Sequence, residues 1–351
     1  MSKNLFFLLS LCFGFVLFIL ALSKIGLKNI FSAVSVFSFS KLFVVLFINF
    51  LIVLVSSWRW KIIIQSRYPL PISFFKVLRA KMIGLTINYL TPVVFIGGEP
   101  VRAYSLKQEA KVPLDKGAAS IVIDGAIYLS VVFLFFLIGL AYLFSYFVPP
   151  KGFLFVTAGV VIFSITVLYI FYYKTFNGDS EEKGFFNFFI SILGLNKIKA
   201  IRKIEQGINN VEQDISYFFK KQKIKLIIAF SLSAAEVLLV LLTYWLVIYF
   251  LGYNSGIKQI LSVNALITLI FLVPIPAALG SFEISQAFVF PFLGISPAIG
   301  ISFSLIIRII NLIMICFGML VFTHFQLSTL IKKAERIEAE IVNRYKKFFY
   351  E

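Results

Sequence analysis

Histidine and cysteine are almost absent from this chain of 351 residues, which has one histidine, His324, and two cysteines, Cys12 and Cys316. Both cysteines lie inside apolar runs, so neither a disulfide framework nor a cysteine–histidine metal site is available. His324 ends the last apolar run, where a histidine at the membrane interface is expected rather than a catalytic one. The chain also has no P-loop, no aspartate-rich cluster and no nucleophile–base set. The residue pattern therefore indicates no metal and no cofactor, and it favours a transport protein over an enzyme.

Charged residues are scarce as well, and their signs are unequal. They make up 14% of the chain, whereas hydrophobic residues make up 60%, and a soluble domain has about a quarter charged residues. The 33 Lys and Arg outnumber the 16 Asp and Glu, and most of the excess lies between apolar runs. There it indicates orientation and contact with anionic lipid headgroups rather than with nucleic acid. The composition predicts a multi-pass protein of the cell membrane.

Apolar runs of sufficient length predict an all-α polytopic protein with about six full membrane spans. The first run has no small-residue cleavage site behind it, so we expect a retained span rather than a signal peptide. Two further runs, 82–98 and 259–280, are broken by glycine and proline and are predicted to be re-entrant helical hairpins. The expected full spans are 5–22, 42–57, 118–148, 152–173, 226–251 and 299–323.

Four parts follow along the chain. Two membrane halves, 1–173 and 226–325, flank a polar linker, 174–225, and a polar tail, 326–351, ends the chain. The linker carries apolar residues at helical spacing, which is typical either of an amphipathic helix on the membrane surface or of a short soluble helical pair. The positive-inside rule places the basic stretch 58–81, the linker, the tail and both termini in the cytoplasm. In that orientation the two halves run in opposite directions.

One spacing occurs twice, at a constant offset of 184 residues. The four pairs are Pro92 and Pro276, Glu99 and Glu283, Pro113 and Pro297, and Asp124 and Arg308. Broken apolar segments at matching places in two halves are typical of a transporter built from structural repeats, and an inverted repeat suits alternating access. We expect the breaks to act as hinges, at Pro92, Gly97, Gly98, Pro274, Pro276 and Gly280.

Charged residues at membrane depth are costly and usually face a cavity or a partner. Five meet this description: Glu99, Arg102, Asp124, Glu283 and Arg308. Asp124 and Arg308 occupy equivalent positions, and we predict that they lie close together in at least one conformation. Such a pair either fixes helix packing, or it leaves Arg308 to bind an anionic headgroup that Asp124 tunes or releases.

Both repeated glutamates stand at predicted helix starts, Glu99 before Pro100 and Glu283 after a potential Ser281 cap. Such ends favour phosphates or carboxylates. The two glutamates therefore either cap their own helices or exchange a proton or cation during transport. Arg102, one turn beyond Glu99, can pair with it or reach a phosphate. The lesser candidates are the amides Asn88, Asn264, Gln286 and Asn311, although most amides within membranes join helices.

Two segments resemble a known family. Residues 97–124, GGEPVRAYSLKQEAKVPLDKGAASIVID, and residues 274–312, PIPAALGSFEISQAFVFPFLGISPAIGISFSLIIRIINL, are similar to two motifs of the lysylphosphatidylglycerol synthase transmembrane, or flippase-like, family. Its members include the flippase half of the bacterial multiple peptide resistance factor and archaeal proteins of lipid-linked glycan assembly. The resemblance covers about residues 5–325 and implies a lipid as the substrate class.

The chain departs from the family pattern in three ways. The family's acidic–arginine pair is Asp124-Gly125 here, so a role that needs two symmetric arginines is not expected. The second motif has Ala277-Ala278 where glycines are common. The tail is also too short for the soluble synthase domain of the fused resistance factors, so synthesis of an aminoacyl lipid is not expected.

The leading hypothesis is a lipid translocase that moves an anionic or modified lipid between leaflets by alternating access. Membrane lipids with anionic headgroups are the expected partners, and the sequence leaves open a homo-oligomer and a separate lipid-modifying enzyme. Two alternatives remain: a membrane-embedded enzyme or subunit of lipid or glycolipid modification, and an ion or solute transporter that uses Glu99 and Glu283. Greasy lateral openings between the halves would favour lipid, whereas an enclosed aqueous cavity would favour solute.

Overall fold

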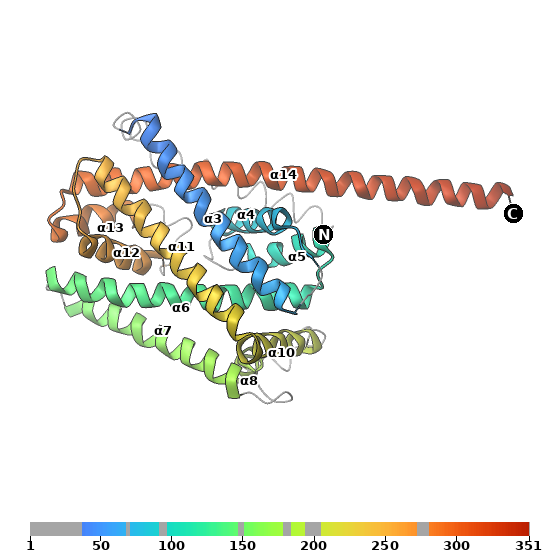
Figure 1. The fold of residues 1–351 in the computed structure, drawn as a ribbon, viewed down its shortest axis with the longest axis horizontal. Helices are drawn as coiled ribbons and strands as arrows, with labels where there is room; N and C mark the ends of the chain where they lie inside the picture. Colours follow the sequence, from blue (N-terminus) through green and yellow to red (C-terminus); the bar gives the residue numbers. More distant parts are fainter. Residues whose placement is uncertain are drawn as a thin grey trace.

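The structure is a computed structural model that describes residues 37–67, 71–90, 97–146, 151–177, 184–193, 205–271 and 281–350. Every element in those ranges is a helix (Figure 1). The expected first span, 5–22, lies outside the described residues. So do four of the expected hinge residues: Pro92, Pro274, Pro276 and Gly280.

Among the described residues, five helices are long and apolar enough to cross a membrane, which confirms the all-α polytopic membrane fold. They are α3 (Phe39–Arg67), α6 (Leu114–Tyr146), α7 (Lys151–Asn177), α11 (Lys223–Phe250) and α14 (Pro297–Tyr350). α3 runs ten residues past the expected end of its span at 57, because Arg59, Lys61 and Arg67 continue the helix. The polar tail likewise continues the last span without a break in α14 (Figure 1).

Shorter helices stand where the broken segments were expected. They are α4 (Phe74–Leu90), α5 (Glu99–Ala110), α12 (Ile257–Phe271) and α13 (Ser281–Val289), the last followed by the 3-10 turn η3 (Phe290–Leu293). α4 begins eight residues before the predicted segment at 82. The apolar pattern starts only after Lys76 and Arg79, but both residues lie in the first turns of the helix. The re-entrant path of both segments stays a prediction.

The two halves have matching elements. α3 and α11 begin at 39 and 223, α4 and α12 at 74 and 257, α5 and α13 at 99 and 281, and α6 and α14 at 114 and 297, so the starts differ by 182 to 184 residues. α3 packs on α11, and the two run in opposite directions, as do α6 and α14 (Figure 1). α4 packs on α14 and α12 packs on α6. This exchange of partners is what a two-fold axis between inverted halves produces.

Glycines allow both of these exchanged contacts to be close. A Cβ added to Gly318 of α14 would lie 2.0 Å from Oγ1 of Thr86 on α4. A Cβ added to Gly139 of α6 would lie 2.2 Å from the carbonyl oxygen of Leu261 on α12. Small residues are the usual means of bringing membrane helices together, because lipid supplies no hydrophobic drive for their association.

The linker contributes α8 (Phe185–Ile192) and α10 (Glu205–Lys221). α10 is amphipathic as predicted, and it packs on α6, α7 and α3 as well as on α8. Its apolar side buries Ile215 and Phe218 in one cluster with Ile63 of α3. The buried carboxylate of Asp214 accepts bonds from Arg67 Nε at 2.6 Å and Lys116 Nζ at 2.7 Å. α10 therefore ties together the ends of α3 and α6.

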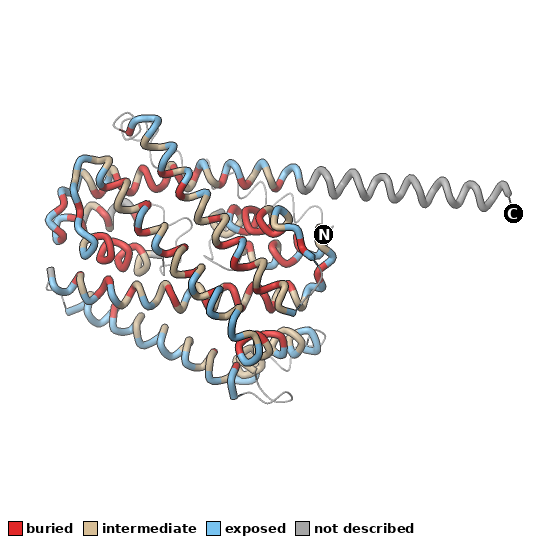
Figure 2. Tube along the Cα trace, viewed as in Figure 1, coloured by how far each residue is buried: buried red, intermediate tan, exposed pale blue. Residues whose placement is uncertain are grey.

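Burial is uneven across the bundle. Buried residues gather along α4, α12 and the facing sides of α3, α6 and α11, whereas α7 is exposed along most of its length (Figure 2). In a membrane that exposed face meets lipid tails. The densely buried region is therefore the crossing of α3, α4, α6 and α11, where the charged residues described next are found.

Candidate functional site

The central charge cluster consists of six residues that pair with one another, and Asp124 of α6 lies at its middle. The Asp124 carboxylate is buried and accepts three charge-assisted hydrogen bonds. Arg59 Nε lies 2.6 Å from Oδ1, Lys81 Nζ lies 3.0 Å from Oδ2, and Arg102 Nη2 lies 3.1 Å from Oδ2. Three cations from α3, α4 and α5 thus converge on one acidic side chain. The remaining members, Glu99 and Glu236, lie at the two ends of the cluster.

Arg59 links the cluster to the second half. Its Nη1 donates to the carboxylate of Glu236 and, at 3.1 Å, to Oγ of Ser233, both on α11. Its guanidinium also lies 5.2 Å from the ring centre of Tyr128. This buried arginine is thus held by two carboxylates and one hydroxyl, as a buried charge requires.

Arg102 links the cluster to the start of α5. Its Nη1 donates to Oε2 of Glu99 at 2.7 Å, which is one of the two roles that the sequence left open for Arg102. Asn88 of α4 donates to the other Glu99 oxygen at 3.2 Å and accepts from the backbone N–H of Gly98 at 2.6 Å. The Arg102 guanidinium lies 4.1 Å from the ring centre of Trp60, a distance typical of a cation–π contact. Asn88, a lesser candidate in the sequence, therefore fixes the first turn of α5.

Two glycines make this arrangement sterically possible. A Cβ on Gly84 would lie 2.2 Å from Cγ of Arg102, so the arginine stem lies across bare backbone of α4. A Cβ on Gly98 would lie 2.1 Å from the carbonyl oxygen of Gly84. The first turn of α5 thus packs directly on α4. The predicted hinge roles of Gly97 and Gly98 stay predictions.

The charges of the cluster balance. Arg59, Lys81 and Arg102 carry three positive charges, and Glu99, Asp124 and Glu236 carry three negative ones. Removing one partner from a buried ion pair is strongly destabilising, because it leaves an uncompensated charge. A phosphate that binds one of these cations therefore competes with a carboxylate that the cation already holds. Glu99 is the most open member, with 26% of its side chain exposed against 9% or less for the others.

Arg308 is not among the ion-pair partners of Asp124 in this conformation, so a close Asp124–Arg308 pair in another conformation stays a prediction. The ion-pair partners of Asp124 are Arg59, Lys81 and Arg102, all from its own half. Arg308 Nη1 instead donates to the hydroxyl of Tyr89 on α4 at 3.2 Å. Equivalent positions in an inverted repeat are related by the axis, but they touch only where they lie on it. The three cations before Asp124 in the chain already satisfy its carboxylate.

The remaining predicted residues lie in the second half. Glu283 is placed on α13 by its backbone, and its side chain lies outside the described residues. For Glu283, the expectation that a charged residue at membrane depth faces a cavity or a partner therefore stays a prediction. Asn311 is half-buried on α14, and Asn264 is buried on α12.

Sequence reasoning missed three members of the cluster. Arg59 and Lys81 belong to the basic stretch 58–81, whose charges predicted a cytoplasmic loop, although α3 and α4 bury both side chains. Glu236 is the only acidic residue in the apolar run 226–251. A lone acid in a span is itself a signal of an intramembrane partner, and its partner here is the missed Arg59.

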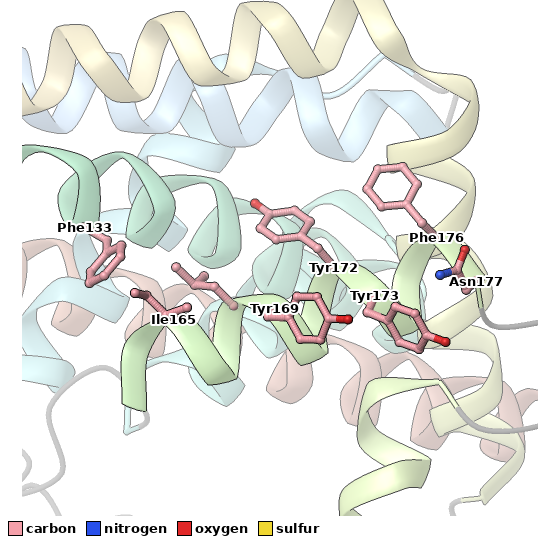
Figure 3. A pocket seen from close by; sticks show the side chains of 8 residues that line it. Phe133, Ile165, Tyr169, Tyr172, Tyr173, Phe176 and Asn177 are labelled. Atoms are coloured by element: carbon pink, nitrogen blue, oxygen red, sulfur yellow. The ribbon is translucent and has the colours of Figure 1, made fainter. Parts of the chain in front are cut away.

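A separate apolar groove of about 540 Å³ runs between α6 and α7. Phe133 of α6 faces a row of α7 side chains that includes Ile165, Tyr169 and Tyr173 (Figure 3). The hydroxyl of Tyr172 is satisfied by a 2.8 Å hydrogen bond with Ser130. The groove suits hydrocarbon rather than a polar solute. It lies within the first half, so it is not the opening between halves that would favour lipid over solute.

Comparisons with known proteins agree with the resemblance seen in the sequence. A family described as the lysylphosphatidylglycerol synthase TM region matches residues 7–318. A UPF0104 membrane protein of Methanothermobacter thermautotrophicus is 22% identical over 284 residues, which cover 76% of this chain and 80% of that protein. A second, from Methanocaldococcus jannaschii, is 25% identical over 319 residues, which cover 88% and 90%. No solved structure matches the chain.

Proposed function

Because this chain belongs to the lysylphosphatidylglycerol synthase TM region family, we propose that it is an integral membrane protein of lipid metabolism that moves a lipid between leaflets. The lipid has an anionic or modified headgroup, and the movement follows alternating access of the two halves. The proposed place is the cell membrane, with both termini in the cytoplasm.

The observation that carries the proposal is the central charge cluster at the contact of two inverted halves. Five members come from α3, α4, α5 and α6 of the first half, and Glu236 comes from α11 of the second. Charged side chains within membranes commonly mark the path of a substrate. Two guanidinium groups and one ammonium aimed at one carboxylate are the donors that a phosphate needs, since a phosphodiester also offers anionic oxygens.

Access to these donors begins at Glu99. Arg102 holds both Glu99 and Asp124, and Glu99 is the member with the most open side chain. A phosphate that replaces Glu99 on Arg102 keeps the guanidinium paired, and the displaced Glu99 carboxylate is partly exposed and keeps the hydrogen bond from Asn88. The acyl chains stay on the apolar outer surface, where the groove between α6 and α7 offers a hydrocarbon lining.

The test uses the full chain in liposomes that contain a fluorescent phosphatidylglycerol and a quencher confined to the outer leaflet. We expect the protein to make the inner-leaflet probe accessible to the quencher, and we expect Arg102→Gln to abolish most of this activity. Arg79→Gln is the matched control, because Arg79 also joins α4 to α5, through Glu109 at 2.8 Å, but its side chain is 41% exposed and lies outside the cluster. We expect Arg79→Gln to transport at the wild-type rate.

Two results would contradict the proposal. One is wild-type protein that moves neither the anionic probe nor its lysyl-modified form faster than protein-free liposomes. The other is Arg102→Gln at the wild-type rate, which would leave the cluster with a packing role alone. Equal rates for an anionic and a zwitterionic probe would remove the assignment of an anionic headgroup.

A further inference from the structure

Gln286 of α13 is fully buried, yet within the described part of the chain neither its Nε2 nor its Oε1 has a hydrogen-bond partner. Most buried polar groups in native proteins are paired, and an unpaired buried amide is expensive. Such a group needs a reason that lies outside the contacts of this conformation. The repeat supplies one.

Gln286 stands at the repeat position of Arg102, because the two are 184 residues apart. In the first half, Arg102 bridges two residues, Glu99 at 2.7 Å and Asp124 at 3.1 Å. Their equivalents in the second half are Glu283 and Arg308. The first half therefore has a bridge that is formed, and the second half has the same three positions with its middle residue unpaired.

The residue types match the charges that they would have to join. A guanidinium has only donors, so Arg102 suits a place between two carboxylates. An amide has a donor end and an acceptor end, so a glutamine suits a place between a carboxylate and a guanidinium. Glu283 and Arg308 are such a pair. The side-chain lengths match too. Gly84 leaves room for the long stem of Arg102, whereas Thr268 occupies the equivalent position on α12 and leaves room only for the shorter glutamine.

A second equivalent residue shows the same asymmetry. Thr243 of α11 stands at the repeat position of Arg59, is buried, and its Oγ1 has no hydrogen-bond partner in the described residues. Arg59 itself is paired with Asp124 and Glu236. Both arginines of the first half are thus engaged in this conformation, and both of their second-half counterparts are not.

We propose that Gln286 is a positioning residue that bridges Glu283 and Arg308 in the opposite conformation, as Arg102 bridges Glu99 and Asp124 in this one. The inference rests on the proposed alternating access, in which the two inverted halves exchange conformations. As the second half takes the arrangement now held by the first, the Arg102 bridge opens and the Gln286 bridge closes. The unpaired amide of Gln286 destabilises the present conformation, and its hydrogen bonds stabilise the opposite one.

The first test is the sign of a stability change in the full-length protein. Gln286→Leu removes an amide that is unpaired here, so we expect an unchanged or higher thermal midpoint together with about a tenfold loss of lipid transport. Gln259→Leu is the control, because Gln259 of α12 is bonded to Tyr253 at 3.0 Å, to the Leu293 carbonyl at 2.6 Å and to the Gly256 N–H at 2.9 Å. We expect the control to lower the midpoint. A Gln286→Leu protein that loses stability as the control does would overturn the proposal, since the amide would then be bonded in this conformation.

The second test measures the conformational equilibrium with spin labels in a background without Cys12 and Cys316. One label pair reports the distance between α5 and α14, and the other reports the distance between α6 and α12. The label sites are exposed residues: Lys107 with Thr323, and Ser145 with Lys258.

Distances between the labels are compared among wild type, Gln286→Leu and Arg102→Gln. We expect Gln286→Leu to deplete the minor distance population about tenfold, since it removes bonds to charged groups from that state alone. Arg102→Gln should enlarge the same population. Identical distributions in all three proteins would refute the proposal.

The two tests separate this inference from the proposed function. Opposite shifts of the label distances in Gln286→Leu and Arg102→Gln, with no movement of any lipid probe by wild type, would keep the switch and reject the lipid substrate. Lipid transport that needs Arg102 but is unaffected by Gln286→Leu would keep the substrate and reject the switch.

Discussion

Asp124→Asn is the substitution whose cost can be worked out most fully, because all three partners of Asp124 are known. Asparagine keeps the size of the side chain but removes the charge. Arg59 would retain Glu236, and Arg102 would retain Glu99. Lys81 would lose the ion pair that the described structure gives it, at 3.0 Å and with 8% of its side chain exposed. The loss therefore falls mainly on Lys81.

Breaking one buried ion pair by removing a single partner typically costs about 3–5 kcal/mol. We expect Asp124→Asn to destabilise the protein by about that amount. Lys81→Met should cost less, because Asp124 keeps two cations and the apolar stem of the side chain is preserved. The double variant Asp124→Asn/Lys81→Met should then be more stable than Asp124→Asn alone, with a coupling of about 1–3 kcal/mol.

The measurement is the free energy of unfolding of all four proteins in the same detergent, under conditions in which unfolding is reversible. The thermal midpoint gives the order of stability as a second readout. Arg308→Gln is a useful comparison, because Arg308 bonds Tyr89 and lies outside the cluster, so its cost should add to that of Asp124→Asn. An Asp124→Asn protein as stable as wild type, or a double variant that loses the sum of both single costs, would refute the reasoning.

Three further predictions follow from other contacts. Gly84→Ala should displace the Arg102 stem, lower the free energy of unfolding by about 1–3 kcal/mol and reduce transport. Gly125→Ala, whose added Cβ meets nothing within 4 Å, should be neutral or stabilising by up to about 1 kcal/mol. The measurements are the free energy of unfolding and the transport rate of both proteins. Asp214→Asn should loosen α10 from α3 and α6 by leaving Arg67 and Lys116 without their shared carboxylate, seen as faster amide hydrogen exchange in α10 with unchanged exchange in α12. Lys111→Cys, in a background without other cysteines, should react with a membrane-impermeant maleimide only after the cells are opened. Ready labelling of intact cells would contradict the proposed cytoplasmic position of this residue.

The helices could be predicted from the sequence because hydrophobic length is a direct measure of bilayer crossing. The ends of the helices were less predictable, because we take the first charged residue after an apolar run as the end of the membrane span. α3 shows why this fails: Arg59 continues the helix because Asp124 and Glu236 on other helices neutralise it. The sequence contains both partners but not their proximity, which depends on helix packing.

The candidate site was predictable only where it is local. Glu99 and Arg102 lie one turn apart on one helix, so their pairing follows from helix geometry. The repeat makes Asp124 and Arg308 equivalent but does not place either residue relative to the axis, so it did not reveal that Asp124 pairs with three cations of its own half in this conformation. Lys81 and Arg59 reach Asp124 from helices far away in the sequence, and no spacing rule connects them. Gln286 was visible as an amide, but its lack of a partner is a property of packing alone.

The equal numbers of positive and negative charges in the cluster have an electrical consequence. A unit charge that crosses the whole membrane potential does work of about 2.3 kcal/mol per 100 mV. A cluster without net charge that moves as one body does no net work of this kind, and the opening of one bridge moves a charge through only a small part of the membrane. The voltage dependence of a transport cycle would therefore report mainly the charge of the cargo. Hyperpolarisation would drive a monoanionic lipid outward, would draw a lipid with one net positive charge inward, and would leave a zwitterionic lipid unaffected.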